Sequence, residues 1–239
     1  MAQNTGNAKN ILVGASPLFL SNIDVTASGY EDNAEPGTGD YAFISGESFT
    51  KTLNDIDQVA GQFGYRNVGY TNNGLQVTYN PSYGSVTVDQ LLDTAKLFKE
   101  SMEVMIATEM AEGTLENVLA VFGQPSNGGS TISSANTLIT NSGTGDAQID
   151  KLGIAAGALG VAPTERQLIA VGQAPTSEAT KTERVYYARR VLSVQQSQFS
   201  LARNAATTFP VTFRLLPSGM EGNEGQEYGF IVDRILVAN

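Results

Sequence analysis

Cysteine, histidine and tryptophan are all absent from this 239-residue chain. Without cysteine and histidine the chain has no disulfides, no thiolate chemistry and none of the usual zinc ligands. It also lacks the commonest general base, so catalysis would depend on carboxylates, lysine or tyrosine. Glycosidases need only two carboxylates, but the pairs Glu109–Glu112 and Glu221–Glu224 have no histidine or aromatic platform in the surrounding sequence. We therefore expect that the protein is not an enzyme and that it binds no metal and no cofactor.

Basic residues and long apolar runs are also scarce. The chain has 14 lysines and arginines against 24 acidic residues, a net charge of −10. Non-specific nucleic-acid binding needs clustered basic residues, and the strand period divides the nearest group, Arg184, Arg189 and Arg190, between two faces. No apolar run approaches the roughly 18 residues of a membrane span. The first ten residues lack the apolar core of a signal peptide. We therefore expect that the protein does not contact a membrane and that it is assembled in the cytoplasm.

What is present is the pattern of a turn-rich β-protein, with 25 glycines and 41% hydrophobic residues. The clearest alternation is in TTFPVTFRLLPS, where Phe209, Val211, Phe213 and Leu215 share one face. Pro210 places this strand on an edge or lies near its start. Further strands are expected in FISGESFTK, in SVTVDQ, in ERVYYARRVLSVQ with its continuation QFSLAR, and in EYGFIVDRILV.

Two segments between residues 65 and 110 need separate interpretation. In NVGYTNNGLQVTYN, the pair Asn73-Gly74 predicts the type I′ turn of a β-hairpin. The run LLDTAKLFKESMEVMIATEM contains helix formers, yet its second half also alternates. Periodicity alone does not decide between helix and strand. We expect a strand from Ser101 to Met110, preceded by a short helical or irregular link.

One short helix is predicted in TLENVLAVFG. Thr114 can cap its start through the side-chain hydroxyl, and Gly123 is placed for a left-handed stop. A helix of about nine residues is not stable alone in water, so its apolar face must pack on the sheet. The members of that face are Leu115, Val118, Leu119 and Phe122.

Two long loops are expected, at residues 23–41 and 124–163. Loops of this length are uncommon in compact domains and often act as binding arms, although the second can equally be a surface excursion. Carboxylates of the first loop, Glu31, Asp32, Glu35 and Asp40, are of the type that calcium prefers. Their spacing is not that of an EF-hand, and we interpret the loop as a solvated acidic segment.

Three groups of segments follow one another in a recognisable order. GYRNVGYTNNGLQVTYN is followed by SVTVDQ and by MEVMIATEMAEGTLENVLAVFG, where a strand leads into the short helix. APTERQLIAVGQAP, TERVYYARRVLSV and TTFPVTFRLLPS come later. In these short segments and in their order, the chain resembles the major tail tube proteins of long-tailed bacteriophages. The resemblance covers residues 64–122 and 167–217. The long segment 124–163 departs from the family pattern.

The resemblance implies one domain over residues 1–239, a β-sandwich or barrel with the helix on the outside of its sheet. Such subunits form hexameric rings that stack into a tail tube in the virion, through long loops and an N-terminal arm, here residues 1–10. Its partners would be further copies of itself and the tail completion, baseplate and tape measure proteins. Double-stranded DNA would pass without specific binding, because like-signed walls repel it. The candidate ring-stacking residues are Tyr30, Glu31, Asp32, Glu35, Asp40 and Tyr41.

Other classes of protein fit the same pattern. A tube protein of a contractile tail or injection system would share the fold. A capsid decoration protein would form trimers or monomers on a shell, and not open tubes. A carbohydrate-binding or hydrolytic β-sandwich is a further alternative, against which the absence of tryptophan counts, since sugars usually bind on aromatic faces.

Overall fold

The computed structural model describes residues 16–21, 65–89, 93–123, 139–142, 149–154, 164–175, 182–194, 197–201, 203, 206–219 and 224–235. Within these ranges the chain is almost entirely strand, with one short helix, which confirms the prediction of a mainly β fold. The elements are β1 (Leu18–Ser21), β2 (Tyr65–Asn67), β3 (Thr71–Thr87), β4 (Thr94–Met110), α2 (Leu115–Val121), β5 (Ile139–Ser142), β6 (Ile149–Leu152), β7 (Arg166–Gln173), β8 (Thr182–Ser193), β9 (Phe209–Leu215) and β10 (Gly229–Ile235).

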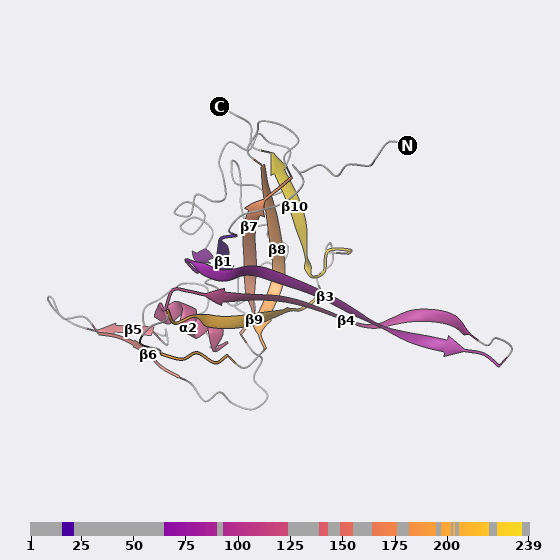
Figure 1. Cartoon of the computed structure of the whole chain (residues 1–239), viewed down its shortest axis with the longest axis horizontal. Helices are drawn as coiled ribbons and strands as arrows, with labels where there is room; N and C mark the ends of the chain where they lie inside the picture. Colours follow the sequence, from indigo (N-terminus) through magenta and orange to yellow (C-terminus); the bar gives the residue numbers. More distant parts are fainter. Residues whose placement is uncertain are drawn as a thin grey trace.

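Eight strands form one antiparallel sheet in the order β2-β1-β7-β8-β9-β4-β3, with β10 paired to β8 beside this path (Figure 1). Strand β7 occupies one edge of β8. The other edge is shared, because residues 182–188 of β8 pair with β10 and residues 191–193 pair with β9. The sheet therefore forks along β8 into a β10 branch and a β9-β4-β3 branch. Strands β5 and β6 form a separate two-stranded sheet.

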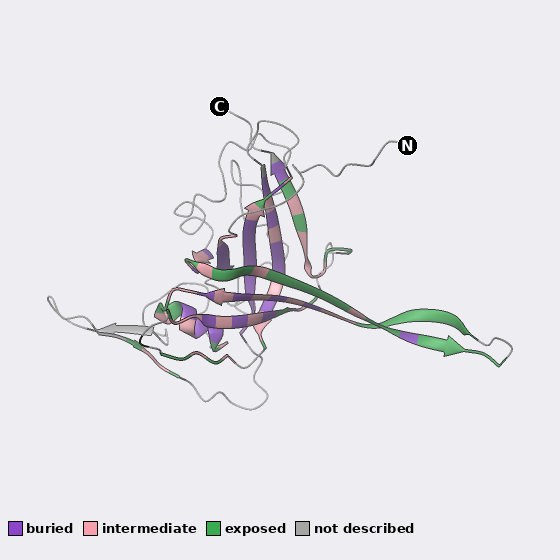
Figure 2. Cartoon of the chain, viewed as in Figure 1, coloured by how far each residue is buried: buried purple, intermediate pink, exposed green. Residues whose placement is uncertain are grey.

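The central strands are buried along most of their length (Figure 2), and their apolar residues form two core clusters. Leu18 and Leu168 belong to the larger core cluster, and their sequence neighbours Phe19 and Ile169 belong to a second one. Consecutive residues of a strand point to opposite faces, so the two clusters lie on opposite sides of the sheet. Burial on both faces explains why β1 and β7 read as nearly continuous apolar runs.

The predicted strand in TTFPVTFRLLPS is confirmed as β9. Phe209, Val211, Phe213 and Leu215 are buried while the residues between them are not. Pro210 is the second residue of this strand, so it lies near the strand start. Strands β8 and β10 are also where the sequence predicts them. The continuation through QFSLAR was wrong, because residues 197–201 form no regular structure, and FISGESFTK lies outside the described residues.

The predicted hairpin turn at Asn73-Gly74 was wrong. Both residues have positive φ, 60° and 67°, but they lie inside β3, where the register against β4 shifts between Asn72 and Gln76. A β-bulge and a type I′ turn use the same left-handed residues, so the local sequence did not distinguish them. The chain reverses about fifteen residues later, between Thr87 and Thr94, and SVTVDQ continues β3 instead of forming a strand of its own.

The link predicted before Ser101 was also wrong, because β4 already begins at Thr94. Strands β3 and β4 therefore form one long hairpin of 17 residues each. Within the described residues, only residues 105–110 of β4 pair with β9. The remainder of the hairpin projects from the body of the molecule as a two-stranded ribbon (Figure 1).

The helix α2 has the predicted ends. The Thr114 hydroxyl accepts a hydrogen bond from the backbone amide of Asn117 at 3.3 Å, and Gly123 has a φ of 62°. The helix packs beside β9, and the Ser193 hydroxyl donates to the carbonyl oxygen of Val121 at 3.0 Å. The long loop predicted at 124–163 was wrong for residues 139–142 and 149–152, which pair as strands β5 and β6.

The predicted packing face of the helix is only partly correct. Leu119 is buried, but Leu115 and Val118 are half-buried. Phe122 follows the last helical residue and is 37% exposed. The most deeply buried helical positions are instead Asn117, Ala120 and Val121. They follow the same spacing of three and four residues, so the predicted stripe was rotated around the helix axis.

Candidate functional site

The candidate ring-stacking residues Tyr30, Glu31, Asp32, Glu35, Asp40 and Tyr41 lie outside the described residues, as does the arm 1–10. Their roles stay predictions. The described polar clusters and surfaces lie in the sheet, the hairpin and the helix.

The carboxylates Glu109 and Glu112 have structural partners near the start of β3. Glu109 Oε2 accepts a hydrogen bond from Asn72 Nδ2 at 3.1 Å. Glu112 Oε1 accepts one from the backbone amide of Tyr70 at 2.9 Å. In the part of the chain that the structure describes, no three potential metal-ligating residues are grouped closely enough to hold an ion. No described helix has the length and apolar character needed to cross a membrane.

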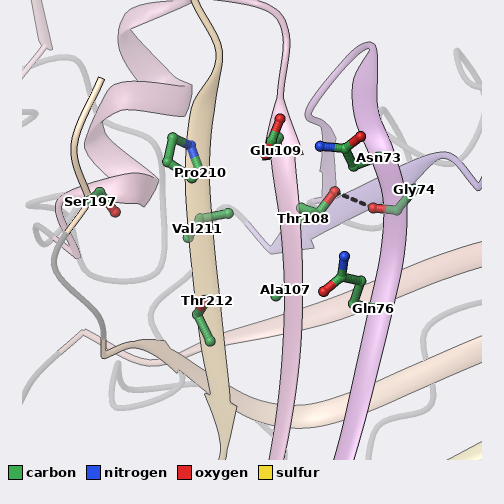
Figure 3. Close-up of a pocket in the computed structure, with 10 residues that line it drawn as sticks. All are labelled: Asn73, Gly74, Gln76, Ala107, Thr108, Glu109, Ser197, Pro210, Val211 and Thr212. Carbon is green, nitrogen blue, oxygen red and sulfur yellow. Dashed lines mark hydrogen bonds between the residues drawn. The ribbon is translucent and has the colours of Figure 1, made fainter. Parts of the chain in front are cut away.

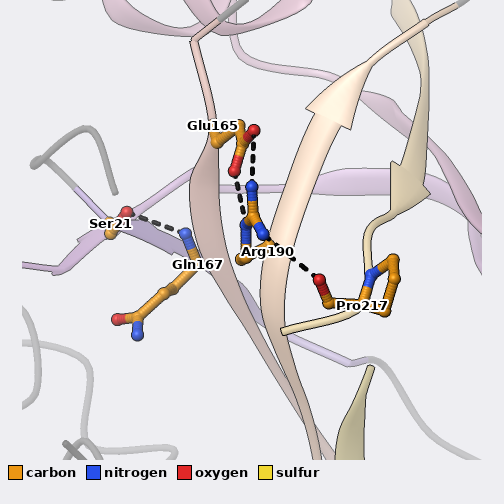
Figure 4. A network of polar contacts seen from close by, with 5 residues as sticks. All are labelled: Ser21, Glu165, Gln167, Arg190 and Pro217. Atoms are coloured by element: carbon orange, nitrogen blue, oxygen red, sulfur yellow. Dashed lines mark hydrogen bonds and ion pairs between the residues drawn. The ribbon is translucent and has the colours of Figure 1, made fainter. Parts of the chain in front are cut away.

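Arg190 belongs to a polar network at the start of β7 (Figure 4). Its guanidinium donates to both carboxylate oxygens of Glu165, at 2.6 and 2.9 Å, and to the carbonyl oxygen of Pro217 at 3.2 Å. Close by, the Ser21 hydroxyl accepts a hydrogen bond from the backbone amide of Gln167 at 2.9 Å. This network joins β1, β7, β8 and the segment after β9.

The other two arginines of β8 have different partners. Arg184 donates to both carboxylate oxygens of Asp233 at 2.6 and 2.7 Å, which raises the pKa of Arg184 and lowers that of Asp233. Arg189 lies over the rings of Tyr187 and Phe230, 5.7 and 5.9 Å from their centroids. Each arginine of this group thus contacts a separate set of residues within the chain.

Asn117 connects the helix to the beginning of β3. Its side-chain amide donates to the carbonyl oxygens of Val68 and Glu112, both at 2.8 Å, and its Oδ1 accepts from Arg66 at 2.6 Å. Burial lowers the pKa of Arg66, and the charge of Glu116 opposes that shift. Asn117 is not among the predicted packing residues of the helix, because a polar side chain does not contribute to an apolar face. The available signal was its spacing, because Asn117 precedes the apolar residues Ala120 and Val121 by three and four positions and so shares their side of the helix.

A small polar pocket of about 150 Å³ lies between the bulge of β3, β4 and β9 (Figure 3). The Thr108 hydroxyl donates to the carbonyl oxygen of Gly74 at 2.9 Å across it. Asn73, Gln76 and Glu109 supply further polar groups. Its volume is below the roughly 300 Å³ at which ligand pockets usually begin, so we do not assign it a ligand.

A larger crevice of about 550 Å³ lies in the fork of the sheet, between β10 and the base of the β3–β4 hairpin. We call it the fork crevice. Its volume is in the range of ordinary ligand pockets. Its apolar lining comes from both branches of the fork and includes Val77, Tyr79, Met102, Phe230 and Ile231.

The outer part of the hairpin is largely exposed (Figure 2), and several of its exposed residues are large and apolar. We call residues 83–87 and 94–99 the distal ribbon. Tyr83, Leu97 and Phe98 are 60%, 64% and 45% exposed. Single exposed apolar residues are ordinary, whereas a group of them marks an interaction surface. The distal ribbon and the fork crevice are therefore the candidate functional surfaces.

Comparison with models of known protein families finds none that matches this chain, and comparison with curated proteins also finds no match.

Proposed function

We propose that this chain is a structural, non-enzymatic protein that assembles with copies of itself into hexameric rings, which stack into the tail tube of a phage virion. The sequence resemblance supplies the specific form of this proposal. Assembly would take place in the host cytoplasm, with tail completion, baseplate and tape measure proteins as further partners.

The observation that carries self-assembly is the position of β3 at the edge of the sheet formed by the described residues. This strand is 17 residues long and ends the order of the described sheet. A long edge strand presents unpaired amide and carbonyl groups that can pair with another chain, and natural proteins usually shorten or protect such edges. Tyr79, with 61% exposure, and Val77, with 50%, lie on this strand. An edge with these properties favours pairing with a neighbouring subunit.

The acidic composition supports the proposal that DNA passes through the channel of the tube. Six subunits would carry six times the net charge of −10. If part of this charge faces the channel, the wall repels the phosphate backbone and DNA passes without adhering.

The experiment that tests the proposal is negative-stain electron microscopy of the purified full chain over a range of concentrations. Hollow tubes or stacked six-fold rings are the expected result. Discrete particles at every concentration, together with binding to a glycan panel, would favour the carbohydrate-binding alternative. Trimers that attach to capsids would favour the decoration protein.

A further inference from the structure

The bulge of β3 contains an asparagine followed by a glycine, Asn73-Gly74. Asparagine is one of the thermolabile residues of proteins. Its side-chain amide can be attacked by the backbone nitrogen of the next residue, and a glycine there has no side chain to obstruct the approach. In a regular strand the paired backbone is held extended, which hinders the attack. The reactivity of this pair therefore depends on how the fold holds it.

The strand register leaves the pair outside the ladder. The pairing of β3 with β4 breaks off at Asn72 and resumes at Gln76, so that residues 73–75 face the single residue Thr108. Extra residues in a bulge are unpaired and locally disrupt the ladder. Strand β3 also ends the order of the described sheet, so no described strand lies along its other side. The described strands therefore hold this pair less firmly than the paired residues on either side.

Solvent and open space surround the reacting groups. Asn73 and Gly74 are both exposed, and a Cβ placed on Gly74 would meet no atom of the described residues within 4 Å. Among the residues that line the adjoining pocket, Figure 3 shows one hydrogen bond, from the Thr108 hydroxyl to the Gly74 carbonyl oxygen, and none to the Asn73 side chain. That bond holds the carbonyl group after the reacting nitrogen and does not involve the Asn73 amide.

Two other asparagines of the described chain are held by hydrogen bonds. Asn72 Nδ2 donates to Glu109 Oε2 at 3.1 Å. Asn117 is buried and makes hydrogen bonds through both its side-chain nitrogen and its side-chain oxygen. The residues that follow them, Asn73 and Val118, also carry side chains that obstruct the attack. These two positions therefore provide internal references for Asn73.

We propose that Asn73 is a site of spontaneous deamidation in the folded chain. The backbone nitrogen of Gly74 loses its proton and bonds to Cγ of Asn73, while the side-chain nitrogen takes up a proton and leaves as ammonia. The product is a cyclic succinimide. Water then adds to one of the ring carbonyl carbons and breaks its bond to the ring nitrogen, which yields aspartate or isoaspartate. Water is the co-reactant of this second step.

Both products change the edge of β3. Each places a new carboxylate at the pocket that Glu109 also lines, and like charges repel each other. Isoaspartate also lengthens the main chain, because the backbone then passes through the former side chain, and this displaces the strand after the bulge. A modified chain therefore presents an altered edge for pairing. This consequence rests on the proposed self-assembly, whereas the modification itself does not.

Peptide mapping by mass spectrometry tests the site. The purified full chain is kept dilute, with light scattering to confirm that it is unassembled, and is incubated at mildly alkaline pH, which favours loss of the Gly74 amide proton. Deamidation raises the mass of the peptide that contains Asn73. The map distinguishes this peptide from that of Asn127-Gly128, the same pair of residues outside the described ranges. The chain unfolded in guanidinium chloride provides the reference rate.

The expected result is conversion of Asn73 in the folded chain many-fold faster than that of Asn72, and within several-fold of the rate in the unfolded chain. Both aspartate and isoaspartate should form, since both arise from the succinimide. Conversion in the unfolded chain alone would show that the fold protects the site and would overturn the inference, as would the absence of conversion in both states. Asn73→Gly, which keeps a residue suited to positive φ, should abolish the mass gain of this peptide.

Asn73→Asp reproduces one of the products and tests the consequence for assembly. Electron microscopy should show several-fold fewer tubes from this variant than from the unaltered chain. Equal numbers of tubes would refute the effect on the β3 edge and leave the modification to be decided by the peptide map. If the unaltered chain forms no tubes, the proposed function fails, while the peptide map still decides whether Asn73 is the modified residue.

Discussion

The side-chain amide of Asn117 in α2 donates a 2.8 Å hydrogen bond to the carbonyl oxygen of Val68, which lies between β2 and β3. The backbone amide of Val68 in turn donates to the carbonyl oxygen of Leu18 at 3.0 Å. The helix, the approach to β3 and strand β1 are thus joined through one residue. This arrangement holds the helix beside the segment that leads into β3.

Replacing Asn117 by alanine should therefore destabilise the fold substantially. The change removes partners from two carbonyl oxygens and from Arg66 in a buried place. Each buried group left unsatisfied costs about 1–3 kcal/mol, so we expect a loss of about 3 kcal/mol in the free energy of unfolding. Chemical denaturation measures this loss. The control is Glu116→Ala, an exposed position of the same helix, and equal losses in both variants would contradict the role of Asn117.

Leu119 and Phe122 should differ in their contributions to stability. Leu119 is 6% exposed, and its replacement by alanine should cost about 2–5 kcal/mol through lost burial and a cavity. Phe122 is 37% exposed and stacks on Phe199 with ring centroids 6.4 Å apart. Phe122→Ala should lower the free energy of unfolding by clearly less, because the side chain that it removes is already partly exposed to solvent. Thermal unfolding of the two variants tests this ranking, and the reverse order would mean that the helix packs through its C-terminal end.

The contrast between β9 and the β3–β4 hairpin shows which features sequence can predict. Strand β9 is buried on one face, so its alternation identified both the strand and its core residues. The hairpin has exposed residues on both faces, so its alternation carried less information. The left-handed pair Asn73-Gly74 then suggested a reversal where the structure has a bulge.

The candidate surfaces were missed for a related reason. Tyr83 and Ile231 looked like ordinary strand residues, since exposure depends on which strands lie beside them. The fork arises because two strands share one edge of β8. Such a division depends on contacts between residues far apart in the chain, which local periodicity does not reveal.

Gly229 should not tolerate even a methyl group. Its φ is 131°, and an added Cβ would lie 2.0 Å from the carbonyl oxygen of Tyr187. Gly229→Ala should therefore displace the start of β10 and lower the free energy of unfolding by more than about 1 kcal/mol. Gly219→Ala is the control, because its Cβ meets no atom within 4 Å. Similar stabilities of the two variants, measured by thermal unfolding, would show that β10 adjusts without cost.

The Arg184–Asp233 pair should make the free energy of unfolding depend on pH in the acidic range. Hydrogen bonding to Arg184 lowers the pKa of Asp233 below its ordinary value. A lowered folded-state pKa means that the stabilisation is present above the unfolded pKa of about 3.9 and is lost as the pH falls through the folded value. The two side chains are 25% and 46% exposed, so solvent screening limits the effect to less than about 1 kcal/mol.

Asp233→Asn isolates this contribution, because asparagine has a similar shape and does not titrate. At pH about 6 the unaltered chain should be more stable than the variant, and the difference should shrink towards zero between pH about 5 and about 2. Added salt should reduce the difference at pH 6, since the pair is partly exposed. Urea unfolding at a series of pH values provides the measurement. A difference that stays constant across this range would show that Asp233 stabilises β10 through packing and not through its charge.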